Sequence, residues 1–435
     1  MSRLALDRAE AQFDDFKHGY SRAQAEAEAN RCLYCEDAPC IAKCPTAINI
    51  PEFIRKIATD NLKGSARTIF SSNILGMSCA RVCPVEVLCV GDCVYNGMDA
   101  PPIQIGKLQR YATDRAFEEG WTFFEAGPDS GKSVGLIGGG PASLACAHEL
   151  RKAGHAVTIY EKRGVIGGLN ATGVAPYKMR ADRAVEEADW ILSIGGVDVQ
   201  TGVEVGVDVS LADLQERHDA VFFGAGLGPD RFLSAPGEDV ASIHGAVAWI
   251  EAMKLGQVSL DGVTHAVVLG GGNTAIDAVR ELLGLGVPCV TMVYRGDEAG
   301  MSGYQHEWSE AKREGARGAW RAQPVGFEHG LGTVTGVTCA VLDGDKKPTG
   351  RSYVEPAELV LVAIGQSKLG DMLSGLEGVT VEWGRVVTDA DGATGRPGFY
   401  AGGDAANGGK EVVNAAAEGM RAARAIDSYL GGDRG

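Results

Sequence analysis

Two stretches of the chain, residues 134–161 and 265–295, repeat one pattern of apolar and polar positions. Each begins with a short apolar run, passes through a glycine turn into a segment with apolar residues every three or four positions, and ends in a second apolar run. Unbroken apolar runs are typical of strands buried on both faces of a parallel sheet, and the spacing of three to four is typical of a helix. The sequence therefore predicts an α/β fold with two Rossmann-like nucleotide-binding units.

The first unit carries the residues expected around the pyrophosphate of a dinucleotide. Gly138-x-Gly140 makes a tight turn before a helix, and the unpaired N–H groups at the start of a helix attract an anion. The second strand ends in an acid that suits a ribose diol, so a glycine-rich core turn is the weaker alternative. The candidate cofactor-binding residues of this unit are Gly138, Gly140, Pro141, Ala142, Ser143 (in place of a third glycine) and Glu161.

The second unit differs at the end of its second strand, which runs into Tyr294-Arg295 instead of an acid. An arginine at this place can pair with the 2′-phosphate of NADPH, or it can be a solvated residue at a strand end. Asp297 and Glu298 follow at once and would repel a phosphate or bind the ribose diol themselves, so NADH is favoured over NADPH. The candidate residues here are Gly270, Gly272, Asn273, Thr274 and Arg295, with Ala363 and Gly365 in a further strand that ends at Gln366.

A third glycine-rich stretch, residues 396–426, predicts an aromatic strand, a glycine turn and an alanine-rich helix. This order is typical of the segment that closes an FAD domain. Asp404 would accept a hydrogen bond from the ribityl chain, unless it is an ordinary turn residue, and the helix N-terminus would stabilise charge on the reduced flavin. With a glycine pair after the first unit, the further FAD candidates are Gly168, Leu169, Gly403, Asp404 and Val412.

These segments divide the chain into four parts, in which the nicotinamide domain is inserted within the FAD domain. The expected parts are a helical domain at 1–131, the first part of the FAD domain at 132–240, the NAD(P)-binding domain at 241–365 and the second part of the FAD domain at 366–435.

Eight of the eleven cysteines lie between Cys32 and Cys93, with spacings C-x2-C-x4-C-x3-C-P and C-x3-C-P-x4-C-x3-C. Two such groups are typical of two [4Fe–4S] clusters, in which the cysteine before a proline can bind the other cluster. Two structural zinc sites are the alternative, but zinc beside a flavin domain would carry no electrons. The two groups are Cys32, Cys35, Cys40 and Cys44, and Cys79, Cys83, Cys89 and Cys93.

The composition narrows the function classes. A net charge of −16 disfavours nucleic acid and anionic membranes as partners, and no apolar run is long enough to span a bilayer, so a cytoplasmic protein is expected. Adjacent carboxylates such as Asp14-Asp15 and Glu186-Glu187 are expected to lie on solvated faces.

The order of parts resembles a family of flavin and iron–sulfur subunits that includes the small subunit of bacterial glutamate synthase. Within it, the chain is most similar to the flavin subunits of bacterial NAD-dependent dihydropyrimidine dehydrogenases. The cysteine spacings, the stretch IGKLQRYATD at 105–114, GPAS at 140–143 and PYKM at 176–179 carry the resemblance.

The resemblance implies ligands that spacing alone does not give. Gln109 would replace Cys79 as a cluster ligand, and Lys178 would contact FAD. One cluster would be held by Cys32, Cys35, Cys40 and Cys93, and the other by Cys44, Cys83, Cys89 and Gln109.

It also implies a function, the passage of electrons from NADH or NADPH through FAD and two clusters to a partner. The partner would be an FMN-containing catalytic subunit with ferredoxin-like clusters, in a hetero-oligomer that reduces uracil or thymine. Alternatives are a glutamate synthase small subunit, a subunit of a bifurcating ferredoxin:NADP transhydrogenase and, outside the enzymes, a metal-binding scaffold that senses nucleotides.

Overall fold

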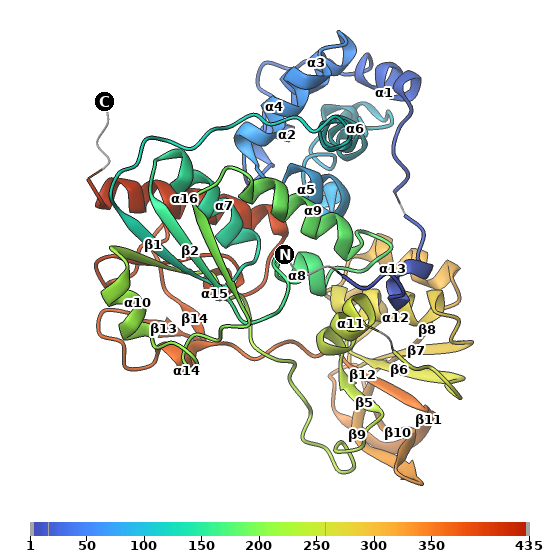
Figure 1. Ribbon diagram of the computed structural model, residues 1–435. Coiled ribbons are helices and arrows are strands. Elements are labelled where there is room, and N and C mark those ends of the chain that lie inside the picture. The colour runs from blue at the N-terminus through green and yellow to red at the C-terminus, as the bar shows by residue number, and fades with distance from the viewer. Residues whose placement is uncertain (1–3, 16, 257, 432–435) are drawn as a thin grey trace.

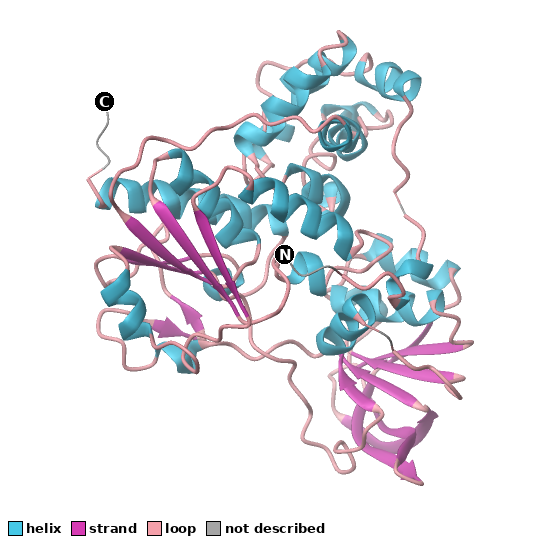
Figure 2. Cartoon of the chain, viewed as in Figure 1, coloured by secondary structure: helices cyan, strands magenta, loops and turns pink. Residues whose placement is uncertain are grey.

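The computed structural model describes residues 4–15, 17–256 and 258–431. Figure 1 shows a helical part in blue, a first α/β unit beside it, and a second α/β unit in yellow and orange below. Figure 2 shows that the strands are confined to these two units.

The N-terminal part is built from short helices around a small core. Helix α3 buries Ile50, Phe53, Ile54 and Ile57, the spacing that places side chains on one face. Ser21 and Gln24 form the capping box at the start of α1. The helices are η1 (Ala9–Gln12), α1 (Arg22–Ala29), α2 (Pro39–Ala42), α3 (Ile50–Ala58), α4 (Leu62–Ser72), α5 (Gly76–Val82), η2 (Val85–Val87), η3 (Val94–Met98) and α6 (Ile105–Glu118).

The first α/β unit has a five-stranded sheet in the order β15-β4-β1-β2-β3, and all its pairs are parallel. Its strands are β1 (Ser133–Ile137), β2 (Ala156–Glu161), β3 (Val197–Thr201), β4 (Ala220–Phe223) and β15 (Phe399–Ala401). Its helices are α7 (Pro141–Lys152), α8 (Leu169–Thr172), α9 (Ala181–Leu192), α10 (Leu211–Arg217), α14 (Gly370–Leu373), α15 (Asp404–Asn407) and α16 (Val412–Tyr429), with the hairpin β13 (Val381–Glu382) and β14 (Arg385–Val386).

The second α/β unit lies between β4 and β15 in the chain, as expected of nested Rossmann-like units. Its parallel sheet has the order β5-β12-β6-β7-β8 and adjoins an antiparallel sheet β11-β10-β9. Its elements are β5 (Ile243–Gly245), α11 (Ala246–Leu255), β6 (His265–Leu269), α12 (Asn273–Gly284), β7 (Cys289–Tyr294), η4 (Glu298–Gly300), α13 (Gln305–Arg313), β8 (Arg317–Trp320), β9 (Ala322–Gly330), β10 (Thr333–Leu342), β11 (Pro348–Pro356) and β12 (Leu359–Val362).

Strand β12 ends at Val362, four residues before the predicted end at Gln366. The chain leaves the sheet here because Gly365 adopts a positive φ of 104°, and Gln366 instead forms an isolated bridge with Asp230.

An N-terminal segment ties the three parts together. Glu10 is fully buried and accepts hydrogen bonds from Arg8 and from the backbone N–H of Ala181 at the start of α9. The prediction that Asp14-Asp15 lies on a solvated face is half wrong: Asp14 is exposed, but Asp15 pairs with Arg110 of α6. The carboxylates of this segment therefore act as cross-links between parts.

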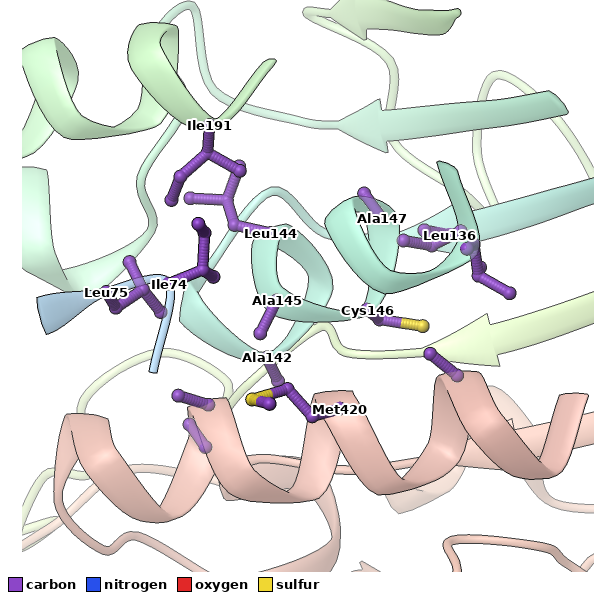
Figure 3. Close-up of a cluster of buried hydrophobic side chains, with 14 of the residues drawn as sticks. Ile74, Leu75, Leu136, Ala142, Leu144, Ala145, Cys146, Ala147, Ile191 and Met420 are labelled. Atoms are coloured by element: carbon purple, nitrogen blue, oxygen red, sulfur yellow. The ribbon is translucent and has the colours of Figure 1, made fainter. Parts of the chain in front are cut away.

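Helix α7 is packed between α9 and α16, as Figure 3 shows with Ile191 on one side and Met420 on the other. The crossing with α16 is close because Gly419 has no side chain: a Cβ there would lie 2.0 Å from the backbone oxygen of Ala142. The start of α7, which carries the predicted pyrophosphate turn, is thus fixed against α16.

Replacing Gly419 with alanine should force α7 and α16 apart. Overpacking of this kind costs about 1–3 kcal/mol, so we expect Gly419→Ala to lower the thermal unfolding temperature by several degrees. Gly300→Ala is the matched control, because a Cβ at Gly300 meets no atom within 4 Å. Equal unfolding temperatures for the two variants would contradict the close crossing.

Candidate functional site

The predicted turn of the first unit forms a glycine cradle at the start of α7. Gly138 has a φ of 89°, and a Cβ there would lie 2.8 Å from the oxygen of Gly224. Gly168 faces Gly140 so closely that its Cβ would lie 2.7 Å from the Cα of Gly140. The structure thereby brings together the candidates at the start of α7 with Gly168 and Leu169.

The carboxylate of Glu161 lies against this turn. It is 4% exposed, and its two oxygens accept from the backbone N–H groups of Gly139 and Arg163, both at 2.7 Å. These bonds hold the carboxylate in one orientation at the carboxyl end of β2, the place where a ribose would lie.

Two buried side-chain oxygens beside the turn fit a polar ligand. Within the described residues, Ser143 Oγ and Asn170 Oδ1 are buried and have no hydrogen-bond partner. A buried polar atom left unpaired costs roughly 1–3 kcal/mol, which a ligand with donor groups would offset. The cradle and these oxygens therefore fit a dinucleotide cofactor.

The segment that precedes α16 places Gly403 against α7 and α16, and Asp404 follows it. Gly403 has a φ of 66°, and a Cβ there would lie 3.0 Å from the Cβ of Ala142. Burial raises the pKa of Asp404, although its Oδ1 accepts from the N–H of Lys410 at 3.2 Å. Val412 begins α16.

Lys178 lies between the two α/β units. Its Nζ is 2.9 Å from Asp277 Oδ1 on α12 and 2.9 Å from a carboxylate oxygen of Glu307 on α13. Burial alone would lower the pKa of Lys178, but the two carboxylates raise it above its ordinary value. In this structure the lysine thus pairs with the second unit.

The second glycine turn lies at the carboxyl end of β6. Gly270 has a φ of 143°, and a Cβ there would lie 2.3 Å from the oxygen of Ala363, so the turn and the end of β12 touch. Asn273 Oδ1 accepts from the N–H of Tyr304 at 2.9 Å. Thr274 follows in the first turn of α12, Gly365 lies beyond β12, and Arg295 is exposed at the end of β7.

The eight clustered cysteines line two cavities. One is bounded by Cys32, Cys35, Cys40 and Cys93, and the other by Cys44, Cys79, Cys83, Cys89 and Gln109. Among the described residues, no three His, Cys, Asp or Glu side chains are placed to hold a single metal ion. The thiols are instead distributed around the walls of the cavities.

Cys79 and Gln109 both reach the second cavity, each with a fixed partner. Asn73 donates to Cys79 Sγ at 3.2 Å, and Gln109 Nε2 donates to the oxygen of Gly76 at 2.8 Å. The bond to Gly76 engages the amide nitrogen, and the carbonyl oxygen is the atom through which an amide would bind iron.

The thiols resist ionisation unless a cation is present. Burial and then neighbouring thiols raise the pKa of Cys40 to about 11, and burial and then Cys44 raise that of Cys89 to about 12. Ligands must be thiolates, and iron supplies the positive charge that stabilises them. The chemistry of both sites therefore fits iron–sulfur clusters.

Helix α16 contacts both the glycine cradle, at Ala142, and the second cysteine cavity. Val413, in its first turn, lines the cavity, and α5, which ends beside Cys83, packs on α16. Ile50 lines both cavities, so the two cysteine sites are neighbours.

The prediction that Glu186-Glu187 is a solvated face is wrong for Glu187, which is fully buried on α9. Its carboxylate accepts from the N–H of Met77 at 2.8 Å and from the N–H and hydroxyl of Ser78, at the start of α5. Burial raises the pKa of Glu187 to about 7, although these bonds lower it. Its place one turn after Ala184 and one turn before Ile191, both buried, was the signal in the sequence.

The sequence matches two families. Residues 9–121 match the family described as dihydropyrimidine dehydrogenase domain II, 4Fe-4S cluster, and residues 132–419 match pyridine nucleotide-disulphide oxidoreductases. Together these matches imply 4Fe-4S, FAD and NAD(P)H. Within the described residues, every helix is too short or too polar to cross a lipid bilayer.

Similar proteins cover most of the chain. The small chain of glutamate synthase [NADPH] from Escherichia coli is 33% identical over 96% of this chain and 94% of its own length. The NAD-dependent dihydropyrimidine dehydrogenase subunit PreT from Salmonella typhimurium is 31% identical over 96% and 97%. The solved structure of FprA from Mycobacterium tuberculosis shares the fold, with a TM-score of 0.57 and 21% identity over 69% of this chain and 85% of that one.

The buried carboxylate predicts a pH dependence of stability. The folded protein holds the proton of Glu187 more tightly than the unfolded chain, whose carboxyl has a pKa near 4.5. The contribution of Glu187 to stability is therefore fully present below about pH 4.5 and is lost as the pH rises through about 7, a loss of about 3 kcal/mol. Urea denaturation of the cluster-loaded protein between pH 5 and 8 measures this slope.

Glu187→Gln should remove the slope, because the neutral amide can accept from the backbone and donate to Ser78. The matched control is Glu186→Gln, since Glu186 is the exposed neighbour and pairs with Arg183. A slope that persists in Glu187→Gln would show that another group titrates.

Proposed function

Because the chain belongs to the pyridine nucleotide-disulphide oxidoreductases and to the family of the glutamate synthase small chain and PreT, we propose that it is an electron-input subunit. It takes electrons from NAD(P)H and delivers them through its iron–sulfur part to a partner chain. One observation carries this proposal: the second cysteine cavity is lined by Val413, in the first turn of the helix that closes the FAD domain.

The two sheets support the proposed domain boundaries. Strands of the first sheet fall within 132–240 and 366–435, and strands of the second sheet fall within 241–365. The cysteines fall within 1–131, which supports a separate iron–sulfur domain.

The residues around the first turn would hold FAD. The pyrophosphate would lie against Gly138 and Gly140 at the start of α7, and Glu161 would accept from the adenosine ribose. Asp404 and the start of α16 at Val412 would face the flavin end, and Lys178 would contact FAD if it leaves its ion pairs with the second unit.

The turn of the second unit would hold the nicotinamide cofactor. Its members are Gly270, Gly272, Asn273 and Thr274, with Arg295, Ala363 and Gly365 around the same edge of the sheet. When bound, the nicotinamide cofactor would supply a hydride, FAD would accept it, and the clusters would carry single electrons.

We propose that each cysteine cavity holds one [4Fe–4S] cluster. Cys32, Cys35, Cys40 and Cys93 would bind the first, and Cys44, Cys83, Cys89 and Gln109 the second. Gln109 enters the second set from the resemblance of residues 105–114, and the match of residues 9–121 to the dihydropyrimidine dehydrogenase 4Fe-4S domain supports a cluster in this part of the chain. Cys79 would keep its bond from Asn73.

The terminal reaction proposed is reduction of uracil or thymine to the 5,6-dihydropyrimidine by an FMN-containing partner subunit with ferredoxin-like clusters. In the sum of the reaction, NAD(P)H and a proton are consumed and one C=C bond becomes a C–C bond. The second candidate is a glutamate synthase small subunit, since its relative is as similar over the same length.

Iron content tests the cluster assignment. Protein purified without oxygen should contain about eight iron and eight sulfide per chain, because two cysteine sites each fit a four-iron cluster. Gln109→Ala should perturb one cluster and Cys79→Ala neither. Loss of about four iron in Cys79→Ala with none in Gln109→Ala would reverse the assignment, and stoichiometric zinc without sulfide would exclude clusters.

Partner dependence tests the proposed role. Alone, the chain should reduce ferricyanide or viologen dyes with NAD(P)H but should not reduce uracil, since every predicted site on it binds a nucleotide or a cluster. Adding the FMN-containing partner should start dihydrouracil formation. Sustained formation by the single chain would contradict the role, and glutamate formation with an amidotransferase partner would favour the second candidate.

A further inference from the structure

The parallel register places two arginines side by side at the carboxyl edge of the second sheet. Tyr294 at the end of β7 pairs with Trp320 at the end of β8, so the next residues, Arg295 and Arg321, leave adjacent strands at the same level. They are 26 positions apart in the sequence, and only the pairing of β7 with β8 brings them together.

The backbone of Arg321 lies against the residue that follows Arg295. Its N–H donates to the oxygen of Gly296 at 3.0 Å. A side chain at Gly296 is obstructed, because a Cβ there would lie 2.6 Å from the ring of Tyr294. Arg321 instead brings a second cation to this corner of the sheet from the neighbouring strand.

Arg321 adopts a conformation that is uncommon for a residue with a side chain, with a φ of 52°. Strained positions of this kind persist where the surrounding structure holds them and are concentrated at functional sites. Here the conformation sets the guanidinium against Asp297, just beyond Gly296.

Both acids that follow Arg295 are already paired. Asp297 bonds to Nε of Arg321, which leaves the two terminal amino groups of the guanidinium outside that bond. Glu298 accepts from Trp308 Nε1 at 3.1 Å and from the ammonium of Lys312. Arg321 and Lys312 thus offset part of the repulsion that favoured NADH from the sequence.

We propose that Arg321, together with Arg295, binds the 2′-phosphate of NADPH and makes this nucleotide the preferred electron donor. The proposal rests on the proposed function, in which the second unit binds the nicotinamide cofactor. Two guanidinium groups on adjacent strands can place two positive charges on one phosphate, whereas a single arginine supplies only one. NADH carries a neutral hydroxyl in place of the 2′-phosphate, so it offers the two arginines no charge to pair with.

The test compares the two nucleotides on the FAD-loaded and cluster-loaded chain. Arg321→Ala should raise the KM for NADPH on the order of 10-fold in dye reduction, the loss expected for a charge-assisted hydrogen bond, while kcat and the KM for NADH stay unchanged. Asp297→Asn should leave the preference for NADPH intact or increase it.

Arg317→Ala is the matched control. Arg317 is exposed on the same strand, but it pairs with Thr291 at the opposite end, so its loss should not affect either nucleotide. Calorimetric binding of 2′,5′-ADP and 5′-AMP gives a readout without turnover: wild type should prefer 2′,5′-ADP, and Arg321→Ala should lose most of that preference.

Equal effects of Arg321→Ala on both nucleotides, or no effect on either, would overturn the proposal while leaving the electron-input role in place. A wild-type preference for NADH would overturn it as well. If neither nucleotide reduces the flavin of the wild-type chain, the proposed function itself fails.

Discussion

The packing of α5 and α7 on α16 is the contact on which the arrangement of sites depends. Because Gly419 has no side chain, α7 approaches α16 so closely that a Cβ at Gly419 would collide with the backbone oxygen of Ala142. This close packing fixes the position of the predicted pyrophosphate turn. Helix α5 rests on the same helix, and Val413 reaches the wall of the second cysteine cavity. A shift of α16 would therefore move the glycine cradle and the proposed cluster site together.

Buried and partly buried polar groups hold the second α/β unit against the first, close to the start of α16. Tyr304, just before α13, donates from its hydroxyl to Glu411 Oε1 at 2.7 Å, and Glu411 is the residue immediately before α16. Lys178 of the first unit forms ion pairs with Asp277 and Glu307 of the second unit. Breaking a buried pair by removing one partner is costly, so these bonds favour one relative placement of the units. The second unit and the second cysteine cavity thus meet at the start of α16.

The sequence predicts what is local. The two βαβ units, the cysteine spacings and the start of α16 each depend on residues within about thirty positions, and the nested order follows from them. What it misses depends on distant pairing: Glu187 is buried because α9 carries it to the start of α5, and Arg321 meets Gly296 because β8 pairs with β7. Spacing alone nominates Cys79, and Gln109 reaches the same cavity only because α6 packs on α5.

The central claim is that electrons pass within one chain from the nucleotide to the iron–sulfur part through the flavin site. Anaerobic rapid mixing of NADPH with the FAD-loaded chain and with FAD-depleted chain that retains its iron measures this directly, with cluster reduction followed by its visible absorbance. The account predicts that clusters are reduced only when FAD is present, at a rate that does not depend on protein concentration. Equal cluster reduction without FAD, or a rate that rises with protein concentration, would contradict it.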